Sequence, residues 1–335
     1  MSLAFDLPRA LEASAPPEAR GLARDEISLL VSDARSNNHE VYPFNSLADF
    51  LNPGDLLVMN DSATIPAALD ARYQDEGFPL HFSTRIAQSL WLAEPRSGTR
   101  FAPGDRLSLP EEAALTLLAP FGGLRPRLWY AHLSIGDDSA SYLNRNGRAI
   151  TYSYLQKRWP ISYYQSIFAK EPGSVEMPSA ARPFSLRTLR TLRGRNIDIA
   201  TITLHCSVAS PESHEPPIME WMNVSPRAAE AIKTARARNK RVVAVGTTVV
   251  RALETATDDG GQPVALRGWT ERVVNRKHPP RIVSTLLTGF HEPAASHLEM
   301  LEAFTSLEFL RDSYDAALRA RLLWHEFGDV HLVLP

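Results

Sequence analysis

Short apolar runs bounded by Pro, Gly, Asn and Asp open the chain. Residues 27–33 (ISLLVSD) and 55–59 (DLLVM) have the length and the Leu and Val content of strands buried in a sheet. Between them, residues 47–51 lead into Asn52-Pro53-Gly54, which predicts a short helix that ends in a turn. A strand, a helix and a second strand in this order predict an α/β fold.

The pattern changes between residues 62 and 150. Short alternating segments are separated there by Pro and Gly at intervals of about 8 to 12 residues, a spacing typical of small β domains. The segments are LHFSTRIA, SLWLAEP, DRLSLP, ALTLLAP and RLWYAHLSI. We expect an inserted antiparallel β-barrel here, with an extended meander on the main sheet as the alternative.

Helix and strand patterns alternate again after residue 150. Ser185 can cap a leucine-rich helix that stops at Gly194, and residues 197–205 then have the pattern of a strand. Ser225-Pro226 opens a further helix, which a strand at residues 241–245 follows. Such alternation implies a largely parallel sheet.

These patterns together predict an α/β fold with two domains. Residues 1–61 and 151–335 are expected to form the larger α/β domain with a mostly parallel sheet. Residues 62–150 are expected to form the small inserted antiparallel β-barrel domain.

The run VGTTVVRALE, which begins at Val245, predicts a strand that passes through a tight turn into a helix. Gly246 permits the turn, Thr247 or Thr248 can cap the helix, and free backbone N–H groups at its start favour an anion. Arg251 follows Thr247 by four residues and can add a charged contact. The alternative is an ordinary capped helix with a solvated arginine.

Composition narrows the class of protein. Hydrophobic residues make up 44% and charged residues 22% of 335, the composition of a globular protein. No apolar run approaches the roughly 20 residues that span a bilayer, and residues 1–25 lack the apolar core of a signal peptide. We expect a cytoplasmic monomer with no membrane partner. The single cysteine, Cys206, excludes an internal disulfide.

A net charge of −2 gives no global attraction to nucleic acid, so an RNA partner would need a local basic patch. Two clusters could contact phosphates, although we favour the interpretation that they are solvated faces. They are Arg187, Arg190, Arg193 and Arg195, and Arg272, Arg276, Lys277 and Arg281.

No histidine pair has the spacing of a metal site. His291 and His297 are six residues apart with Pro293 between them, and His325 and His331 have the same separation, so neither pair lies one helical turn apart. His205 and Cys206 are adjacent and would point to opposite faces of a strand. We expect no metal.

Motifs in a fixed order along nearly the whole chain resemble those of the S-adenosylmethionine:tRNA ribosyltransferase-isomerase family. They include Asp55-Leu56-Leu57, Asn60-Asp61, Tyr164-Gln165, Gly173-Ser174-Val175, Pro178-Ser179-Ala180, Thr203-Leu204-His205, the VGTTVVRALE run, Gly289-Phe290-His291 and Gly328-Asp329.

This resemblance implies an α/β domain with an inserted β-barrel and S-adenosylmethionine as co-substrate. Family members transfer and isomerise its ribosyl part onto a 7-aminomethyl-7-deazaguanine base in tRNA in the queuosine pathway. The products are epoxyqueuosine, adenine and methionine.

The resemblance also implies roles for individual residues. The sulfonium acidifies the ribose C5′ hydrogens, so a neutral base can remove one, and His291 and His205 are the candidates. The substrate-binding candidates are Gly246, Thr247, Thr248 and Arg251 for the methionine carboxylate or another anion, Tyr164 and Gln165 for the purine or deazaguanine, and Ser179 of the Pro-Ser-Ala motif.

The sequence departs from the family pattern at several motifs. The family's P-T-A-G-L-H-F-T is PSAARPFS at residues 178–185, its H-x-M-H-x-E retains only the Glu within residues 215–220, and its G-L-G-T-F after His205 is CSVAS. The arginine of N-D-T-R is Ala63, and the terminal S-Y-G-D begins with Glu326. Two alternatives therefore stay open: an enzyme of this fold with a small-molecule acceptor or with lyase or isomerase activity, and a non-catalytic nucleotide- or RNA-binding relative.

Overall fold

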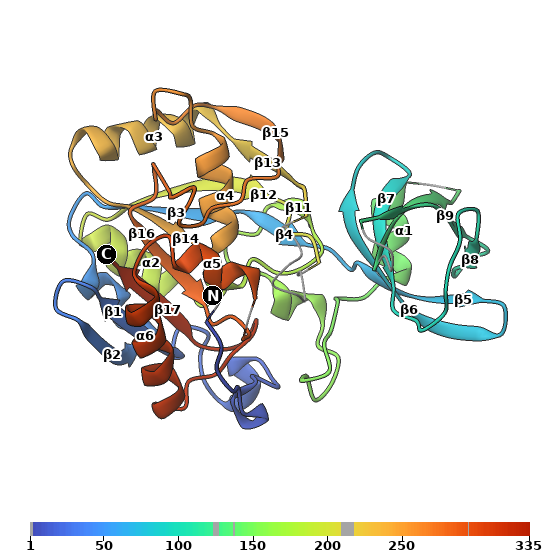
Figure 1. Ribbon diagram of the computed structural model, residues 1–335, viewed down its shortest axis with the longest axis horizontal. Helices are drawn as coiled ribbons and strands as arrows, with labels where there is room; N and C mark the ends of the chain where they lie inside the picture. Colours follow the sequence, from blue (N-terminus) through green and yellow to red (C-terminus); the bar gives the residue numbers. More distant parts are fainter. Residues whose placement is uncertain (1–2, 123–126, 137, 209–217, 294) are drawn as a thin grey trace.

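Two bodies make up the molecule, a large one built on a nine-stranded sheet and a small barrel beside it (Figure 1). The computed structural model describes residues 3–335 except 123–126, 137, 209–217 and 294. The strands of the large sheet are, in spatial order, β15 (Leu266–Thr270), β13 (Glu220–Val224), β12 (Asp198–Leu204), β3 (Leu56–Asn60), β14 (Val242–Val245), β16 (Thr285–Gly289), β17 (Val330–Leu334), β1 (Ser28–Asp33) and β2 (Asn38–Pro43).

The centre of this sheet is parallel, as the alternation of helices and strands predicted. Strands β12, β3, β14 and β16 pair in parallel, and so do β17 and β1. The edge strands β15, β13 and β2 pair antiparallel with their neighbours, and so do β16 and β17. The sheet is therefore mixed, with four parallel strands at its centre, and the α/β fold class is confirmed.

Helices and short 3-10 turns cover both faces of the sheet. The helices of the large body are α2 (Leu186–Gly194), α3 (Pro226–Ala237), α4 (Thr247–Thr255), α5 (Ser296–Leu301) and α6 (Leu307–Arg319). The 3-10 turns are η1 (Arg9–Leu11), η2 (Pro17–Arg20), η3 (Phe44–Phe50), η4 (Ile161–Tyr164) and η5 (Ser179–Ala181). None of the helices in the described ranges is both long enough and apolar enough to cross a membrane.

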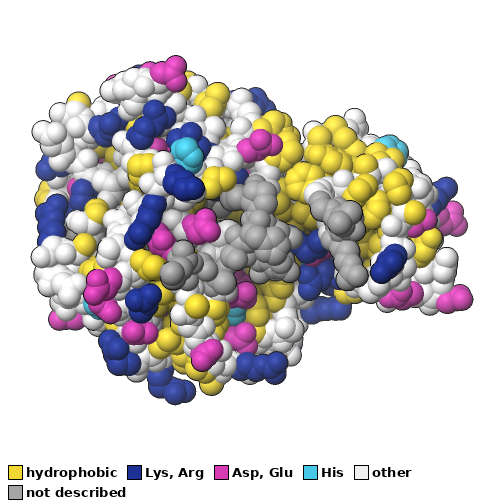
Figure 2. Space-filling model, viewed as in Figure 1, with side chains coloured by type: hydrophobic (Ala, Val, Ile, Leu, Met, Phe, Trp, Pro, Cys, Tyr) yellow, Lys and Arg dark blue, Asp and Glu magenta, His cyan; other side chains and the backbone are white. Residues whose placement is uncertain are grey.

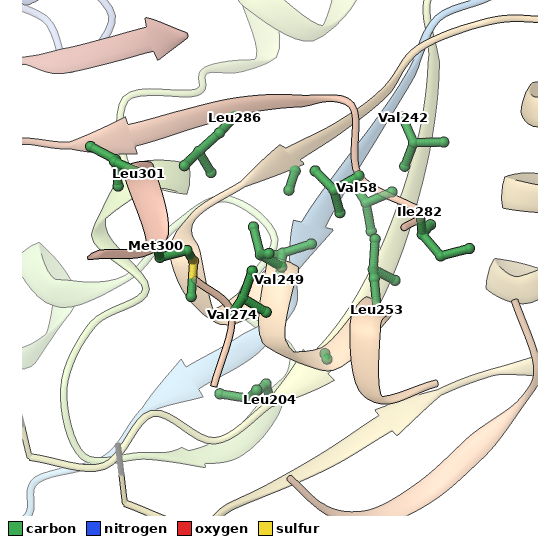
Figure 3. Packing of buried hydrophobic residues seen from close by; sticks show 14 of the residues in the cluster. Val58, Leu204, Val242, Val249, Leu253, Val274, Ile282, Leu286, Met300 and Leu301 are labelled. Carbon is green, nitrogen blue, oxygen red and sulfur yellow. The ribbon is translucent and has the colours of Figure 1, made fainter. Parts of the chain in front are cut away.

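Alternation along the strands divides the interior of the large body into two cores. In β14, Val242 and Ala244 belong to the core that α3, α4 and α6 cover, whereas Val243 and Val245 belong to the core under α2 and η3. Figure 3 shows the first core, where Val249 and Leu253 of α4 lie near Val58. Both faces of a central strand are thus buried, which is why these strands are continuous apolar runs.

Six strands close the barrel in the order β10, β7, β6, β5, β8 and β9. They are β5 (Ala68–Tyr73), β6 (Glu76–Arg85), β7 (Leu90–Pro95), β8 (Arg106–Ser108), β9 (Ala114–Phe121) and β10 (Leu128–Ser134), and α1 (Ser139–Asn146) follows them. Phe82 and Trp91 meet edge to face inside it, with ring centroids 5.2 Å apart. The predicted inserted antiparallel barrel is confirmed, and the boundaries at residues 62 and 150 stay predictions.

Two strands lie where the chain passes between the bodies. Strand β4 (Ser62–Thr64) pairs in parallel with β11 (Glu171–Ser174), so the segment that leaves the sheet is tied to the segment that returns from the barrel. The cavity between the two bodies is bordered by Thr64 of β4 and by Val175 and Glu176, which follow β11.

Two of the three predicted helix N-caps are confirmed, and one is wrong. Ser185 and Ser225 accept hydrogen bonds from the N–H groups of Thr188 and Ala228, as expected of N-caps. Helix α4 instead has Gly246 as its N-cap, with φ of 102° and no side-chain cap. The prediction that Thr247 or Thr248 caps α4 is wrong, because the glycine turns the chain one residue earlier.

Candidate functional site

A cavity of about 600 Å³ lies between the barrel and the carboxyl ends of the central strands. The segments after β14 and β16 border it on the sheet side, and Glu94 and Arg127 border it on the barrel side. Ligands of open α/β sheets bind at the carboxyl ends of the strands, so this is the expected place for a site. The lining residues used below are Tyr152, Tyr154, Tyr164, Glu176, Ser179, Gly246, Thr247, Thr248, Arg251, Arg272, His291, His297, His325 and Glu326.

The turn at Gly246 presents the start of α4 to this cavity. The N–H groups of Val249 and Val250 return to the carbonyl of Gly246, at 3.1 and 3.4 Å. The N–H groups of Thr247 and Thr248 have no acceptor in the described part of the chain. The first turn of the helix therefore offers two donors and the positive end of the helix dipole to an anion.

Arg251 lines the same cavity, but its guanidinium is held by the protein. It forms a buried ion pair with Glu220 and donates to the carbonyls of Arg272 and Ile218, at 3.1 and 3.0 Å. Glu220 in turn accepts from the backbone N–H of Ser207 at 2.9 Å. Helix spacing predicted a side chain available to an anion, whereas the contacts make Arg251 the cation that fixes Glu220 and the loop after β12. The partner comes from a distant strand, which spacing along α4 cannot reveal.

His291 follows β16 and lies half-buried at the cavity. Its Nε2 is within 3.0 Å of the Thr288 hydroxyl, and its ring stacks on that of His297 with centroids 4.7 Å apart. Its backbone carbonyl accepts from the Trp324 indole at 3.0 Å, which fixes the loop. Burial, with His297 and His331 nearby, lowers the pKa of His291, so the imidazole is neutral near pH 7. In the tautomer whose Nε2–H donates to Thr288, Nδ1 can accept a proton.

His205 occupies a separate cavity of about 580 Å³ beside β12 and β13. Its Nδ1 hydrogen-bonds the Ser62 hydroxyl at 2.8 Å, and its ring stacks on Trp221 with centroids 4.9 Å apart. A Cβ on Gly173 would lie 2.5 Å from the ring, so the glycine is the surface on which the imidazole rests. Burial lowers the pKa of His205 to about 4. The structure does not bring the two histidines into one cavity.

Of the remaining predicted site residues, two line the large cavity and one does not. Tyr164 lines the large cavity, and its phenol hydroxyl is buried without a hydrogen-bond partner in the described structure. Ser179 lines it from η5. Gln165 is used elsewhere, because its amide oxygen accepts from the backbone N–H of Thr64 at 3.0 Å and its amide nitrogen donates to the Thr64 carbonyl at 2.8 Å. Gln165 pins strand β4 and is absent from the lining of the cavity.

Sequence reasoning missed a wall of the cavity formed by Tyr152, Tyr154, Glu176 and Glu326. The Tyr152 hydroxyl donates to Glu176, and the Tyr154 hydroxyl donates to Glu326. The Tyr154 ring stacks on His325 with centroids 3.9 Å apart and an interplanar angle of 6°. The only signal in the sequence was Glu326, which begins a motif that starts with Ser in the family.

Some members of the basic clusters are paired with acids. Arg187 contacts the buried Asp25 at 2.7 Å, and Arg195 forms an ion pair with Asp49. On the face seen in Figure 2, positive and negative side chains are interspersed over the large body. Arg272 differs from the others, because it lines the cavity and its Nε is buried without a partner in the described ranges.

Two of the segments that depart from the family pattern lie partly outside the described residues. Residues 209–217 include the end of the CSVAS segment and half of the segment 215–220. Of the histidine, cysteine and acidic side chains that are described, no group of three or more is placed to hold a metal ion.

Comparisons with known proteins cover the chain from end to end. A model of the queuosine biosynthesis protein family matches residues 1–333. The S-adenosylmethionine:tRNA ribosyltransferase-isomerase of Moorella thermoacetica is 33% identical over 343 residues, which cover 98% of each chain. The Thermus thermophilus enzyme of the same name is 33% identical over 309 residues and 86% of each chain. The crystal structure of S-adenosylmethionine tRNA ribosyltransferase from Thermotoga maritima superposes with a TM-score of 0.56, at 25% identity and 99% coverage of both chains.

Proposed function

The chain belongs to the queuosine biosynthesis protein family, and from that membership we propose that it is an S-adenosylmethionine-dependent tRNA ribosyltransferase-isomerase. The proposed reaction transfers and isomerises the ribosyl part of S-adenosylmethionine onto a 7-deazaguanine base in tRNA. Adenine and methionine are released. tRNA is the proposed partner, and the cytoplasm is the proposed place of action.

The observation that carries the proposal is the convergence of distant motifs on one cavity. Tyr164, Ser179, Gly246 and His291 lie far apart in the sequence and line the same 600 Å³ space. A space of this size suits a nucleoside-sized ligand. The cavity opens between the sheet and the barrel, so a base that projects from a tRNA loop can enter from the side of the barrel.

His291 is the proposed base. It would take a proton from ribose C5′, whose acidity the adjacent sulfonium raises, and the lowered pKa keeps the imidazole unprotonated and ready to accept. The Thr288 hydroxyl, 3.0 Å from Nε2, orients the ring so that Nδ1 is available to the substrate. A positioned base of this kind contributes about 10²- to 10⁴-fold to a rate.

The start of α4 is the proposed site of the methionine carboxylate. The N–H groups of Thr247 and Thr248 supply donors there, and Arg272 supplies a cation whose buried Nε has no partner among the described residues. Arg251 acts through Glu220 as a positioning residue. Calorimetry should show weaker S-adenosylmethionine binding for Arg272→Ala than for the exposed control Arg276→Ala; equal affinities would remove Arg272 from the site.

The proposed function is tested by adenine release. The purified protein is incubated with S-adenosylmethionine and a tRNA that carries 7-aminomethyl-7-deazaguanine, and adenine is measured by chromatography. Release is expected with this tRNA and not with a tRNA that carries guanine at the same position. Equal release from S-adenosylmethionine alone would indicate a lyase, and binding without release under every condition would indicate a non-catalytic relative.

A further inference from the structure

The phenol–carboxylate wall, formed by Tyr152, Tyr154, Glu176 and Glu326, is built from segments far apart in the chain. The two tyrosines lie on the segment that returns from the barrel, Glu176 follows β11, and Glu326 precedes β17. The Tyr152 and Tyr154 rings are parallel within 23°, with centroids 5.8 Å apart, and the stack continues onto His325. Each phenol donates to one carboxylate, so both carboxylates are held at the same aromatic stack.

Two further buried acids that border the cavity already have cations. Glu94 pairs with Arg127 at 2.9 Å and with Arg96 at 3.1 Å. Glu220 pairs with Arg251. These two carboxylates are therefore compensated without a ligand, so neither supplies excess negative charge to attract a cation.

Glu326 is different, because it has no ion-pair partner within the described structure. Arg182 attracts it electrostatically, but the Arg182 guanidinium donates to Glu18 at 2.8 Å and to the carbonyl of Tyr163 at 2.9 Å. Within the described structure, the Glu326 carboxylate accepts a hydrogen bond from the neutral phenol of Tyr154. A buried carboxylate with only neutral partners is costly unless a cation reaches it.

A second observation also points to a ligand at this wall. Tyr164 is only 3% exposed, borders the same cavity and has a hydroxyl with no hydrogen-bond partner in the described structure. Its pKa is raised first by burial and then by the charge of Glu326, so the hydroxyl lies within the field of that carboxylate. Buried hydroxyls without partners are rare, and a ligand that donates or accepts there would satisfy this one.

We infer that the phenol–carboxylate wall binds an alkylammonium group of the ligand and that Glu326 determines specificity for it. The carboxylates supply charge-assisted acceptors, and the tyrosine rings supply faces that attract cations. The inference rests on the proposed function, in which two groups have this chemistry: the α-ammonium of the methionine half and the aminomethyl group of the acceptor base. An anion at the start of α4 and a cation at this wall would fix the ligand at two points.

Two pairs of probes separate these sources. The first is decarboxylated S-adenosylmethionine, which has a sulfonium and an ammonium, against 5′-dimethylsulfonio-5′-deoxyadenosine, which keeps the sulfonium and has no ammonium. The second is 7-aminomethyl-7-deazaguanine against 7-methyl-7-deazaguanine. Neither ammonium-bearing probe has a carboxylate, so the anion site at α4 does not contribute to the comparison.

The experiment measures the affinity of each probe by calorimetry for the wild type, for Glu326→Gln and for the exposed control Glu230→Gln. Glutamine keeps the size and the acceptor oxygen for Tyr154 but removes the charge. We expect Glu326→Gln to weaken one ammonium-bearing probe roughly tenfold and its ammonium-free partner less than about twofold, as loss of a charged hydrogen bond predicts. The probe that is weakened identifies the source, and the control should bind all four like the wild type.

Equal affinities of Glu326→Gln and wild type for both ammonium-bearing probes would overturn the inference, as would an equal loss for both members of a pair. Should Glu326→Gln not fold, Glu326→Ala is measured instead, and affinities equal to those of the wild type for both ammonium-bearing probes would overturn the inference in the same way. Adenine release by the wild type is scored separately. If the wild type turns over and Glu326→Gln binds the ammonium-bearing probes as the wild type does, only the role of the wall is refuted. If the wild type prefers an ammonium-bearing probe but releases no adenine, only the proposed reaction is refuted.

Discussion

The two cavities each contain a histidine that the sequence placed among the candidates, and their surroundings differ. His291 faces the large cavity, with Thr288 on one ring nitrogen and Nδ1 without a protein partner in the described structure. His205 rests on Gly173, stacks on Trp221 and gives its Nδ1 to Ser62. A histidine within a family motif can therefore serve packing or chemistry, and its contacts decide between the two.

Removing Arg251 is expected to have the largest effect on stability. Arg251→Ala leaves the carboxylate of Glu220 buried without its cation, which costs about 3–5 kcal/mol in the free energy of unfolding. The control Arg195→Ala breaks an exposed pair with Asp49 and should cost under about 1 kcal/mol. Urea denaturation measures both, and equal small losses would show that the large cavity does not depend on the Arg251–Glu220 pair.

The packing role of His205 is tested next by Gly173→Ala. The added methyl would lie 2.5 Å from the imidazole, so the ring or the strand must move. This movement should lower the free energy of unfolding by about 1–3 kcal/mol. Gly268→Ala is the matched control, because a Cβ there meets nothing within 4 Å. The loss should be smaller when His205 is also replaced by Ala. Purely additive losses in the double variant would contradict the contact.

Acid should destabilise the protein through histidines in both cavities. Burial lowers the pKa of His205 and of His297 to about 4; the charge of Glu171 opposes the shift at His205, and that of Arg251 adds to the shift at His297. Below about pH 6.5 the unfolded chain binds protons at these sites and the folded chain does not, so stability falls as pH drops toward 4. Each site contributes a slope of at most about 1.4 kcal/mol per pH unit.

Urea denaturation at pH 7, 6 and 5 measures this dependence. Buried Glu326 and Asp329, whose pKa values burial raises, act in the opposite direction, so the comparison is made between the wild type and His205→Gln. The variant should lose less stability than the wild type between pH 6 and 5. Parallel curves would mean that His205 is not held neutral by burial.

Much of the fold follows from local pattern. The apolar runs at residues 27–33 and 55–59 form strands β1 and β3. Ser185 and Ser225 cap the helices that they were predicted to cap. These features depend on neighbours along the chain, so the sequence reports them directly. The alternating segments between residues 62 and 150 became a closed barrel for the same reason.

The site was less predictable, because its contacts join distant residues. The amide of Gln165 is occupied by Thr64, and the guanidinium of Arg251 by Glu220, neither of which any local spacing indicates. Tyr152 and Tyr154 lie in an irregular segment without periodicity, so their place on the cavity wall had no signal. The resemblance to the family indicated His291, Tyr164 and Gly246 as candidates. That they lie at one cavity is seen only in the folded chain.

The most direct test of the account compares adenine release by His291→Ala and His205→Ala. Both variants are incubated with S-adenosylmethionine and the modified tRNA, after circular dichroism has shown that they fold. We predict a loss of about 10²-fold or more for His291→Ala with S-adenosylmethionine binding retained, and a loss of under about tenfold for His205→Ala. Full turnover by His291→Ala, or a larger loss in His205→Ala than in His291→Ala, would contradict the assignment of the chemistry to the large cavity.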